Sequence, residues 1–348
     1  MENASMLKRE FVPDAIISVV KTIEHSGFNV FIVGGAVRDL LLGRIPIEYD
    51  LATNALPNDI IQLFDHTTPV GINYGTVLVH HDGANIEVTT FRTESSYKDQ
   101  RHPEHVHFVS SIQDDLRRRD LTINAMAYQP LKESLIDPFD GRKDLDLRQI
   151  RTVGNPLHRF EEDALRPYRC FRFMSQLGFA LQLDLREALK QLSNIQQPAI
   201  ERIRYEMERM LMGRYWSAGV SAMTLTGWLD HFGISIDVHS IPQLPHDRLF
   251  RWAWLISHGN FDQLSKTFQF SKQDIRQMKH ILNWNFDEFA ILFELSDLAV
   301  NTEQLQSLGF QGKDLGAIQS HLLELVRSKM LLNQKDVLLD EAKKIIKN

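Results

Sequence analysis

Residues 76–91, TVLVHHDGANIEVTTF, contain two runs rich in β-branched side chains on either side of Asp82-Gly83. Asp-Gly is the dipeptide favoured in tight hairpin turns, and flanking β-rich runs are typical of paired strands. The segment therefore predicts an antiparallel β-hairpin. It is the clearest local constraint on the fold of this chain.

Both helices and strands are expected around the hairpin, because helical spacing alternates with short β-rich runs up to about residue 153. The expected helices are 13–25, 36–43, 57–64 and 114–128, and the expected strands before the hairpin are 29–33 and 48–53. Pro57 suits the first turn of its helix. The polar segment 93–105 lacks periodicity and predicts a mobile loop. This pattern is typical of a small mixed α/β domain.

After residue 153 strand signals become scarce, and apolar residues recur at helical intervals to the C-terminus. The predicted class is α+β, with an N-terminal mixed α/β head that carries a small β-sheet and an all-α remainder. From turn residues we expect four domains, namely a head at 1–153, a neck at 154–212, a body at 213–270 and a tail at 271–348.

Composition excludes several classes of protein. A chain of 348 residues with one cysteine, Cys170, can form a sizeable core but no internal disulfide, and its N-terminus has no apolar stretch resembling a signal peptide. No apolar run approaches the roughly 18 to 20 residues of a membrane span. We therefore expect a cytoplasmic protein without a membrane role. The net charge of −6 does not by itself suggest a nucleic-acid partner.

Glu48 and Asp50 are separated by one residue on an expected strand, so both carboxylates point to the same face. This spacing lets them share a divalent ion, although a lone Glu-x-Asp is more often an exposed strand edge. The Gly34-Gly35 turn favours the functional interpretation because it opens a helix, and the free N–H groups of a helix N-terminus suit phosphate. Arg38, one turn into that helix, adds a positive charge.

Glu87 on the second hairpin strand supplies a third acid. If Ile86 and Val88 face the core, Glu87 lies on the open face beside the strand that carries Glu48 and Asp50. Mg²⁺ prefers oxygen ligands from carboxylates, water and substrate phosphates. Two such ions can activate an attacking hydroxyl and stabilise a leaving oxygen.

Several motifs occur in a fixed order along the first 210 residues. They are FIVGGAVRDLLLGRIPIEYDLATNALP, EVTTFR with RHPEHVHF, DDLRRRDLTINAMAY, RFEEDALRPYRCFRF and AIERIRYEM. Together they resemble the ordered motifs of the class II tRNA nucleotidyltransferases, the CCA-adding enzymes and their bacterial poly(A) polymerase relatives.

The resemblance implies a role for each motif residue. Gly35 and Arg38 would contact the triphosphate, and Glu48 and Asp50 would hold the metal, with Glu48 standing where the family usually has Asp. The remaining nucleotide-binding residues would be Arg119 with Asp120, Asp163 with Arg166, and Arg169 and Arg172. Residues of the loop 92–101 would help to switch the pocket from C to A.

Asp163 and Arg166 are suited to base recognition. Cytosine and adenine both present an exocyclic amino donor beside a ring-nitrogen acceptor, so a carboxylate plus a guanidinium can pair with either. Uracil and guanine place a carbonyl opposite the carboxylate, and an unpaired buried polar group costs about 1 to 3 kcal/mol. Asp163, Arg166, Arg169 and Arg172 recur every three residues, so we expect the first three to share a broad face of one helix. A salt-bridged solvent face is the structural alternative. Pro167 predicts a kink or a helix start in this segment.

The expected function is template-independent addition of CCA to the 3′ end of tRNA from CTP and ATP, by two-metal phosphoryl transfer with release of pyrophosphate. The expected cofactor is Mg²⁺, the catalytic residues are Glu48, Asp50 and Glu87, and the tail would bind tRNA. Three alternatives stay open: a poly(A) polymerase, an enzyme that adds only A to tRNA, and a catalytically silent RNA-binding protein. The sequence does not indicate an oligomeric state.

Overall fold

The computed structural model describes residues 7–97, 103–192, 195–282, 295, 298–327 and 335–346. The chain divides into two compact units. The first comprises Met1–Cys170 and Phe179–Pro198, and the second comprises Phe171–Gly178 and Ala199–Asn348. The four-domain division expected from the sequence stays a prediction.

The first unit is built on a seven-stranded sheet with the order β3-β4-β5-β2-β1-β8-β9. Its strands are β1 Val30–Val33, β2 Asp50–Thr53, β3 Thr67–Gly71, β4 Thr76–His81, β5 Ala84–Thr90, β8 Ala127–Gln129 and β9 Ser134–Ile136. The pairing of β2 with β5 is parallel, and the other pairs are antiparallel. The hairpin predicted around Asp82-Gly83 is confirmed as β4–β5.

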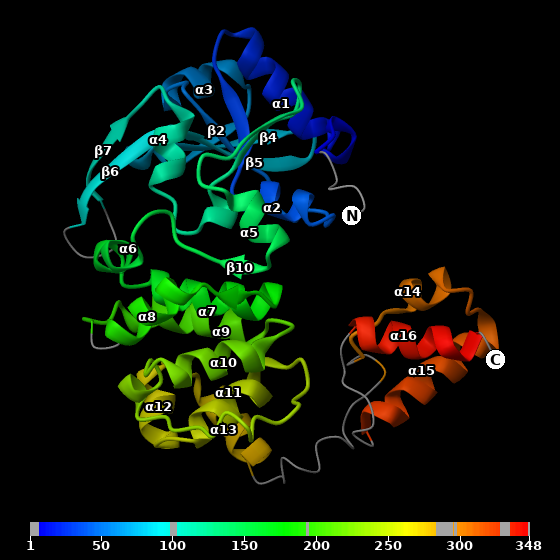
Figure 1. Ribbon diagram of the computed structural model, residues 1–348. Helices are drawn as coiled ribbons and strands as arrows, with labels where there is room; N and C mark the ends of the chain where they lie inside the picture. The colour runs from blue at the N-terminus through cyan, green and yellow to red at the C-terminus, as the bar shows by residue number, and fades with distance from the viewer. Residues whose placement is uncertain are drawn as a thin grey trace. The chain divides into compact units, whose positions relative to one another are not determined.

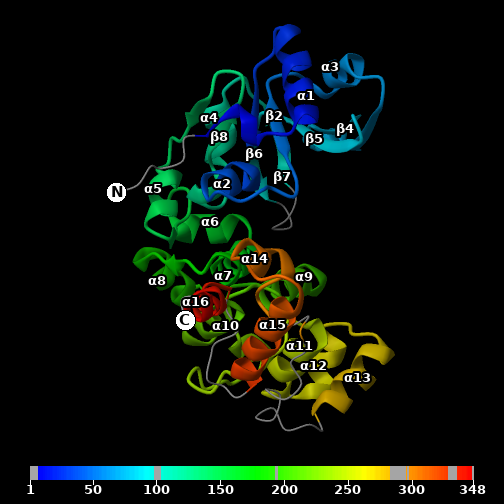
Figure 2. The same ribbon diagram turned by 90° about the vertical axis from the view of Figure 1, so that its right-hand side faces the viewer.

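One face of the sheet is covered by α1 Asp14–His25 and α3 Pro57–Leu63, which lie side by side in Figures 1 and 2. Burial alternates along β5, where Ile86 and Val88 are almost fully buried and Glu87 between them is exposed. This alternation is the strand periodicity that the sequence indicated. It leaves Glu87 on the face opposite the two helices.

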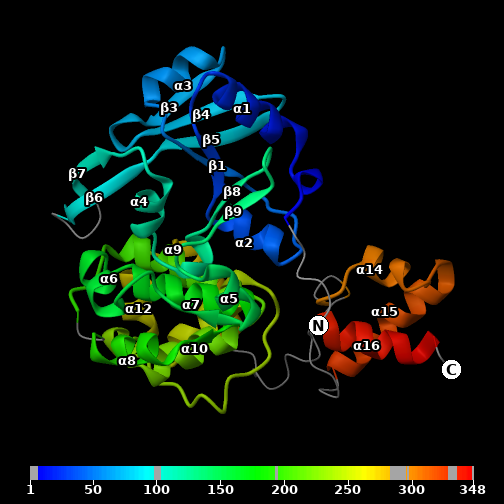
Figure 3. The ribbon, with the colours of Figure 1, turned by 45° about the horizontal axis from the view of Figure 1, so that its top comes forward.

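The opposite face is only partly covered. Buried Val33 and Ala52 pack there with Phe91 and with Ile112 and Leu116 of α4 Ile112–Arg117. In Figure 3 α4 and α2 Gly35–Leu41 lie on the other side of the sheet from α1 and α3. The first residue of β2 stays exposed beside this core.

Three local expectations are wrong. The segment expected to be a loop forms an antiparallel ribbon, β6 Arg92–Tyr97 with β7 Pro103–Phe108, because two polar strands satisfy their backbone groups by pairing with each other. The strand expected from residue 48 begins at Asp50. The helix expected at 114–128 ends after Arg117, and the 3₁₀ turn Thr122–Asn124 leads into β8. Residues 98–101 of the expected switching loop, which include Asp99 and Arg101, lie outside the described residues.

The rest of the described chain is mainly helical, as predicted. The helices are α5 Gly141–Asp146, α6 Pro156–Glu162, α7 Arg166–Leu177, α8 Leu183–Gln191, α9 Ile200–Leu211, α10 Trp216–Leu225, α11 Arg248–Ser257, α12 Phe261–Thr267, α13 Lys272–Leu282, α14 Thr302–Ser307, α15 Gly312–Arg327 and α16 Lys335–Ile346. A short parallel bridge joins β10 Gln149–Ile150 to β11 Ala180–Leu181. Pro167 lies in the first turn of α7, so the predicted helix start is confirmed.

Candidate active site

Asp50 begins β2, a central strand of the sheet, and is exposed on the face that is only partly covered. Its register partner on the parallel neighbour β5 is Glu87, so the two carboxylates start from adjacent strand positions. Glu48 precedes the strand and is exposed, as Asp50 is. Between them Tyr49 is buried, and its hydroxyl donates to the Phe11 carbonyl at 3.4 Å. The buried tyrosine fixes the segment while the acids on either side reach solvent.

The three acids influence one another electrostatically. Displacement of water by the surrounding protein raises the pKa of Asp50 above its ordinary value of 3.8, and the charge of Glu87 raises it further. Arg119 acts in the opposite direction, and Glu48 adds a smaller upward contribution. A bound cation would reduce the repulsion between these negative charges.

The raised pKa of Asp50 predicts that its charge destabilises the protein when no metal is bound. The folded state binds the Asp50 proton more tightly than the unfolded chain, so stability falls as pH rises from 3.8 through the raised pKa. Asp50→Asn should therefore increase the free energy of unfolding slightly near neutral pH. Urea denaturation in EDTA measures this effect, with Asp65→Asn as the exposed control on the same unit. A less stable Asp50→Asn protein would contradict the assignment.

The Gly34 turn brings α2 and Arg119 to Asp50. Gly34 is the N-cap of α2 with φ 72° and ψ −132°, a conformation that favours glycine. A β-carbon at Gly34 would lie 3.1 Å from Nη1 of Arg119 and 4.0 Å from Oδ2 of Asp50. The glycine therefore leaves room for the guanidinium and carboxylate at the start of α2, where the first backbone N–H groups lack helical partners.

Asp115, which was not among the predicted site residues, holds this arginine in place. Its carboxylate is fully buried and pairs with Arg118 at 2.9 Å and with Arg119 at 3.2 Å. The backbone N–H of Arg92 also donates to it at 3.2 Å. Burial alone would raise the pKa of Asp115, but the two guanidinium groups outweigh it and lower the pKa. The signal for this role was the Asp115 to Arg119 spacing of one helical turn.

Arg38 and Asp120 are also held by protein partners. The Arg38 guanidinium donates to Asp39 at 2.9 Å and to Oδ1 of Asn124 at 2.8 Å, and only 12% of its side chain is exposed. Asp120 accepts from its neighbour Leu121 N–H at 2.8 Å and pairs with Arg169 at 2.8 Å. Ion pairing therefore connects the Arg-Arg-Asp motif to the segment that carries the expected base-reading residues.

Asp163 precedes α7 and does not lie on it, which corrects the expectation of one helix carrying Asp163, Arg166 and Arg169. The helix begins at Arg166. Oδ1 of Asp163 accepts from Leu165 N–H at 3.0 Å, so the carboxylate is held in an Asx turn between α6 and α7. Placed before the helix, Asp163 is oriented by this turn and not by helical periodicity.

Arg166 is buried against α6. Its Nη1 donates to the Arg159 carbonyl at 3.0 Å and forms a short ion pair with Glu162, which is 39% exposed. Glu162 also pairs with Arg159 at 2.8 Å. Glu162 was not among the predicted site residues, although its i,i+4 spacing to Arg166 was a usable signal.

Arg172 belongs to the second unit, whereas the other expected nucleotide-binding residues belong to the first. It forms a 2.6 Å ion pair with Glu206 of α9, and both side chains are less than a tenth exposed. Its guanidinium carbon lies 4.2 Å from the ring centre of Phe173. These contacts give Arg172 a packing role inside the second unit, and a direct contact with nucleotide stays a prediction.

Within the described ranges, no three His, Cys, Asp or Glu side chains are close enough to form a metal site alone. Mg²⁺ is usually held by one or two carboxylates together with water and substrate phosphates. The Glu48–Asp50 pair beside the arginine-lined α2 turn has the donor chemistry for such a shared site.

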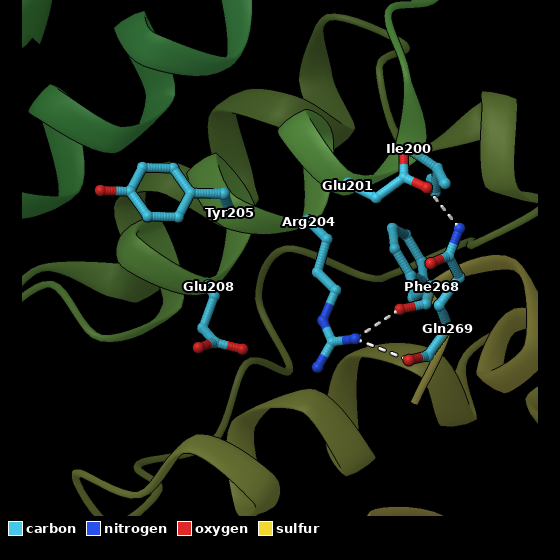
Figure 4. Close-up of a pocket in the computed structure, with 7 residues that line it drawn as sticks. All are labelled: Ile200, Glu201, Arg204, Tyr205, Glu208, Phe268 and Gln269. Carbon is cyan, nitrogen blue, oxygen red and sulfur yellow. Dashed lines mark hydrogen bonds between the residues drawn. The ribbon is translucent and has the colours of Figure 1, made fainter. Parts of the chain in front are cut away.

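A hollow in the second unit, shown in Figure 4, has a structural role. Nη1 of Arg204 donates to the carbonyls of Phe268 at 2.9 Å and Gln269 at 2.8 Å, and Gln269 adopts a left-handed φ of 53°. Nε2 of Gln269 donates to Glu201 at 2.6 Å. The arginine thus satisfies two carbonyls at the end of α12 and holds the strained turn against α9.

Removing Arg204 should destabilise the second unit. Arg204→Ala leaves both carbonyls without this donor and removes the guanidinium from the Phe270 ring, whose centre is 4.5 Å away. We expect a loss of about 1 to 3 kcal/mol in the free energy of unfolding, measured by urea denaturation. Arg209→Ala is the control, because Arg209 lies exposed on the same helix and contacts Tyr205. Equal effects of the two changes would contradict the role of Arg204.

Two family models match the chain. The model described as the poly A polymerase head domain matches residues 30–151, and the one described as a probable RNA and SrmB-binding site of polymerase A matches residues 178–233. None of the helices in the described ranges has both the length and the apolar character needed to cross a membrane.

Curated relatives and solved structures extend the match over the chain. A CCA-adding enzyme of Leuconostoc citreum is 33% identical over 99% of this chain and 98% of its own length. A CCA-adding enzyme of Bacillus pumilus is 44% identical over 67% of this chain, which covers 56% of that relative. The chain thus spans just over half the length of some curated relatives that it matches. A crystal structure of the Bacillus stearothermophilus CCA-adding enzyme with CTP has a TM-score of 0.69 and 27% identity, covering 96% of this chain and 98% of that one.

Proposed function

This chain belongs to the class II tRNA nucleotidyltransferases, the family of the CCA-adding enzymes, and on that premise we propose that it adds CCA to the 3′ end of tRNA. The substrates are CTP and ATP, and the acceptor is the 3′ hydroxyl of the RNA. The observation that carries the proposal is the meeting of Asp50, Glu87 and Arg119 at the Gly34 turn. A carboxylate pair for a cation thus lies beside an arginine and free helix N–H groups for phosphate.

In the proposed reaction, the RNA 3′ oxygen forms a bond to the α-phosphorus of the incoming nucleotide. The bond from that phosphorus to the oxygen bridging the α- and β-phosphates breaks, pyrophosphate leaves, and the hydroxyl proton passes to water. Arg119, fixed by Asp115, is oriented to contact phosphate beside Asp50. Positioning and charge neutralisation supply most of the acceleration in such transfers.

We propose Mg²⁺ as the divalent ion and Glu48 and Asp50 as the residues that hold it. The ions would supply positive charge that makes the attacking hydroxyl more acidic and offsets the charge of the leaving pyrophosphate. The upward effect of Glu87 and Glu48 on the pKa of Asp50 supports a cation at this place. Glutamate at position 48 keeps the charge of the usual aspartate and is one methylene longer.

Base choice is proposed to reside in Asp163 and Arg166, with the nearby Asp120–Arg169 pair completing the pocket. Asp163 is oriented by its bond to Leu165 N–H, and Arg166 by Glu162 and the Arg159 carbonyl. Both side chains are thereby set in position before a nucleotide arrives. A carboxylate and a guanidinium so placed favour C and A over U and G.

A nucleotide-selection assay tests this function. Purified protein receives a tRNA that lacks its 3′ CCA, one nucleoside triphosphate at a time, and either Mg²⁺ or EDTA. We expect incorporation of C from CTP only when Mg²⁺ is present, and none from UTP or GTP. Incorporation of ATP alone, without CTP, would support a poly(A) polymerase or an A-adding enzyme, and no incorporation would support an RNA-binding protein without activity.

We propose the cytoplasm as the place of action. Cys170 is the one cysteine of the sequence and is buried, which suits a reducing compartment.

A further inference from the structure

Two isoleucines stand almost fully in solvent immediately before the carboxylate pair. Ile45 is 92% exposed and Ile47 is 98% exposed. In the described part of the chain, these are the highest values among the exposed large apolar side chains. Isoleucine is one of the residue types most often fully buried in proteins. Two such side chains in one short segment therefore form an apolar surface, and its exposure to solvent requires an explanation.

The segment that carries them is anchored on both sides. At its start, the backbone N–H of Arg44 donates to the Asp39 carbonyl at 2.8 Å. Pro46, between the two isoleucines, is buried, and Tyr49 is buried with its hydroxyl on the Phe11 carbonyl. The isoleucines are thus presented outward from a segment whose neighbours are fixed.

The segment lies within reach of the reacting end of an RNA. Ile47 is three residues before Asp50, so their α-carbons are at most about 11 Å apart. Stacked nucleotides of one strand are spaced by about 3.4 Å. A strand whose 3′ hydroxyl meets Asp50 can therefore place its last two or three nucleotides over this segment.

Charge favours RNA as the occupant. Arg44 is exposed next to Ile45 and can meet a phosphate, whereas the isoleucines can meet only an apolar surface such as the face of a base. Isoleucine and proline side chains are used as wedges against nucleic-acid bases. Single strands are bound by cations that contact the backbone and by flat apolar side chains, mostly aromatic, that support the bases.

We propose that Ile45 and Ile47 form an apolar support on which the last nucleotides of the RNA acceptor rest, so that the 3′ hydroxyl is aligned with Asp50. This inference rests on the proposed function and adds positioning residues for the acceptor. Their loss should weaken the use of RNA while binding of the incoming nucleotide is unchanged.

The test compares a double variant, which carries both Ile45→Ser and Ile47→Ser, with the wild-type protein. The KM for tRNA lacking CCA should rise about tenfold, the effect of losing roughly 1.4 kcal/mol of apolar contact. The Kd for CTP, measured by equilibrium dialysis, and the melting temperature should stay unchanged. Replacing both isoleucines by leucine should retain the wild-type KM, because leucine preserves the apolar surface.

A matched control replaces Val70 and Ile72 by serine, since these residues are 54% and 42% exposed elsewhere on the same unit. The inference is overturned if the RNA KM of the Ile45 and Ile47 serine variant stays within about twofold of wild type or if the control shows the same rise. It is also overturned if the CTP Kd rises in parallel, or if sedimentation shows a wild-type dimer that the double change dissociates. Wild-type protein that adds nothing to tRNA would instead overturn the proposed function.

Discussion

Asp50→Asn should reduce nucleotide addition by at least about a thousandfold, which corresponds to losing several kcal/mol of charge stabilisation at the transition state. The change keeps the shape of the side chain and removes the charge that faces Glu87 and Arg119. A cation site that depends on two adjacent carboxylates then keeps only Glu48. Single-turnover incorporation of CTP into tRNA lacking CCA measures the loss.

Stability separates this effect from misfolding. The same variant is expected to be slightly more stable than wild type without metal, so inactivity combined with a higher free energy of unfolding identifies a functional charge. Asp65→Asn, an exposed aspartate on the same unit, should keep both activity and stability. If the Asp50→Asn variant kept full activity, the assignment of Asp50 as a metal ligand would be wrong.

Asp163→Asn should relax base choice. Oδ1 of Asp163 accepts from Leu165 N–H in the turn before α7, and an asparagine oxygen can keep that bond. The second carboxylate oxygen, which is an acceptor, is then replaced by an amide NH₂ group. This group is a donor that can pair with the carbonyl of uracil or guanine. Because an unpaired buried polar group costs about 1 to 3 kcal/mol, incorporation of UTP relative to CTP should rise by about 5- to 150-fold.

Competition between CTP and UTP on the same tRNA measures this selectivity. Glu161→Gln is the control, because Glu161 is an exposed acid on neighbouring α6. The rejection of UTP should be unchanged in the control. If Asp163→Asn folds, adds CTP and still rejects UTP as strongly as wild type, the protein template lies elsewhere.

The sheet face that carries Glu87 was predictable from simple strand periodicity. Alternation along residues 84–90 was enough to place Glu87 on the open side, and the parallel pairing with β2 then set it beside Asp50. Periodicity is a local property that survives folding, since one face of the strand must be buried. The register between β2 and β5 depends on the whole sheet and could not be read from either strand.

Segments whose conformation depends on charged partners were predicted poorly. Residues 114–128 have the composition of a helix, but Asp120 accepts from Leu121 N–H and pairs with Arg169 where the chain leaves α4. The resulting turn at the Arg-Arg-Asp motif was not predictable from propensity, because its partner is distant in sequence. The same limitation hid the role of Asp115, whose importance comes from Arg92, Arg118 and Arg119 together.

The helix expected from Asp163 to Arg172 illustrates a related error. A repeat of charged residues every three positions was interpreted as one helical face, but Asp163 lies in the turn before the helix. Aspartate is favoured in such turns, and Pro167 in the first turn of α7 was the signal that the helix begins there.

The most direct test of the central claim is the sequence of the RNA ends that this protein makes. Wild-type protein is incubated with a tRNA lacking its 3′ CCA, with CTP, ATP and Mg²⁺ together, and the products are sequenced. The site built on Asp50, with Asp163 and Arg166 choosing the base, predicts products that end in CCA and are not extended further. A long A tail, or ends identical to the starting RNA, would contradict it.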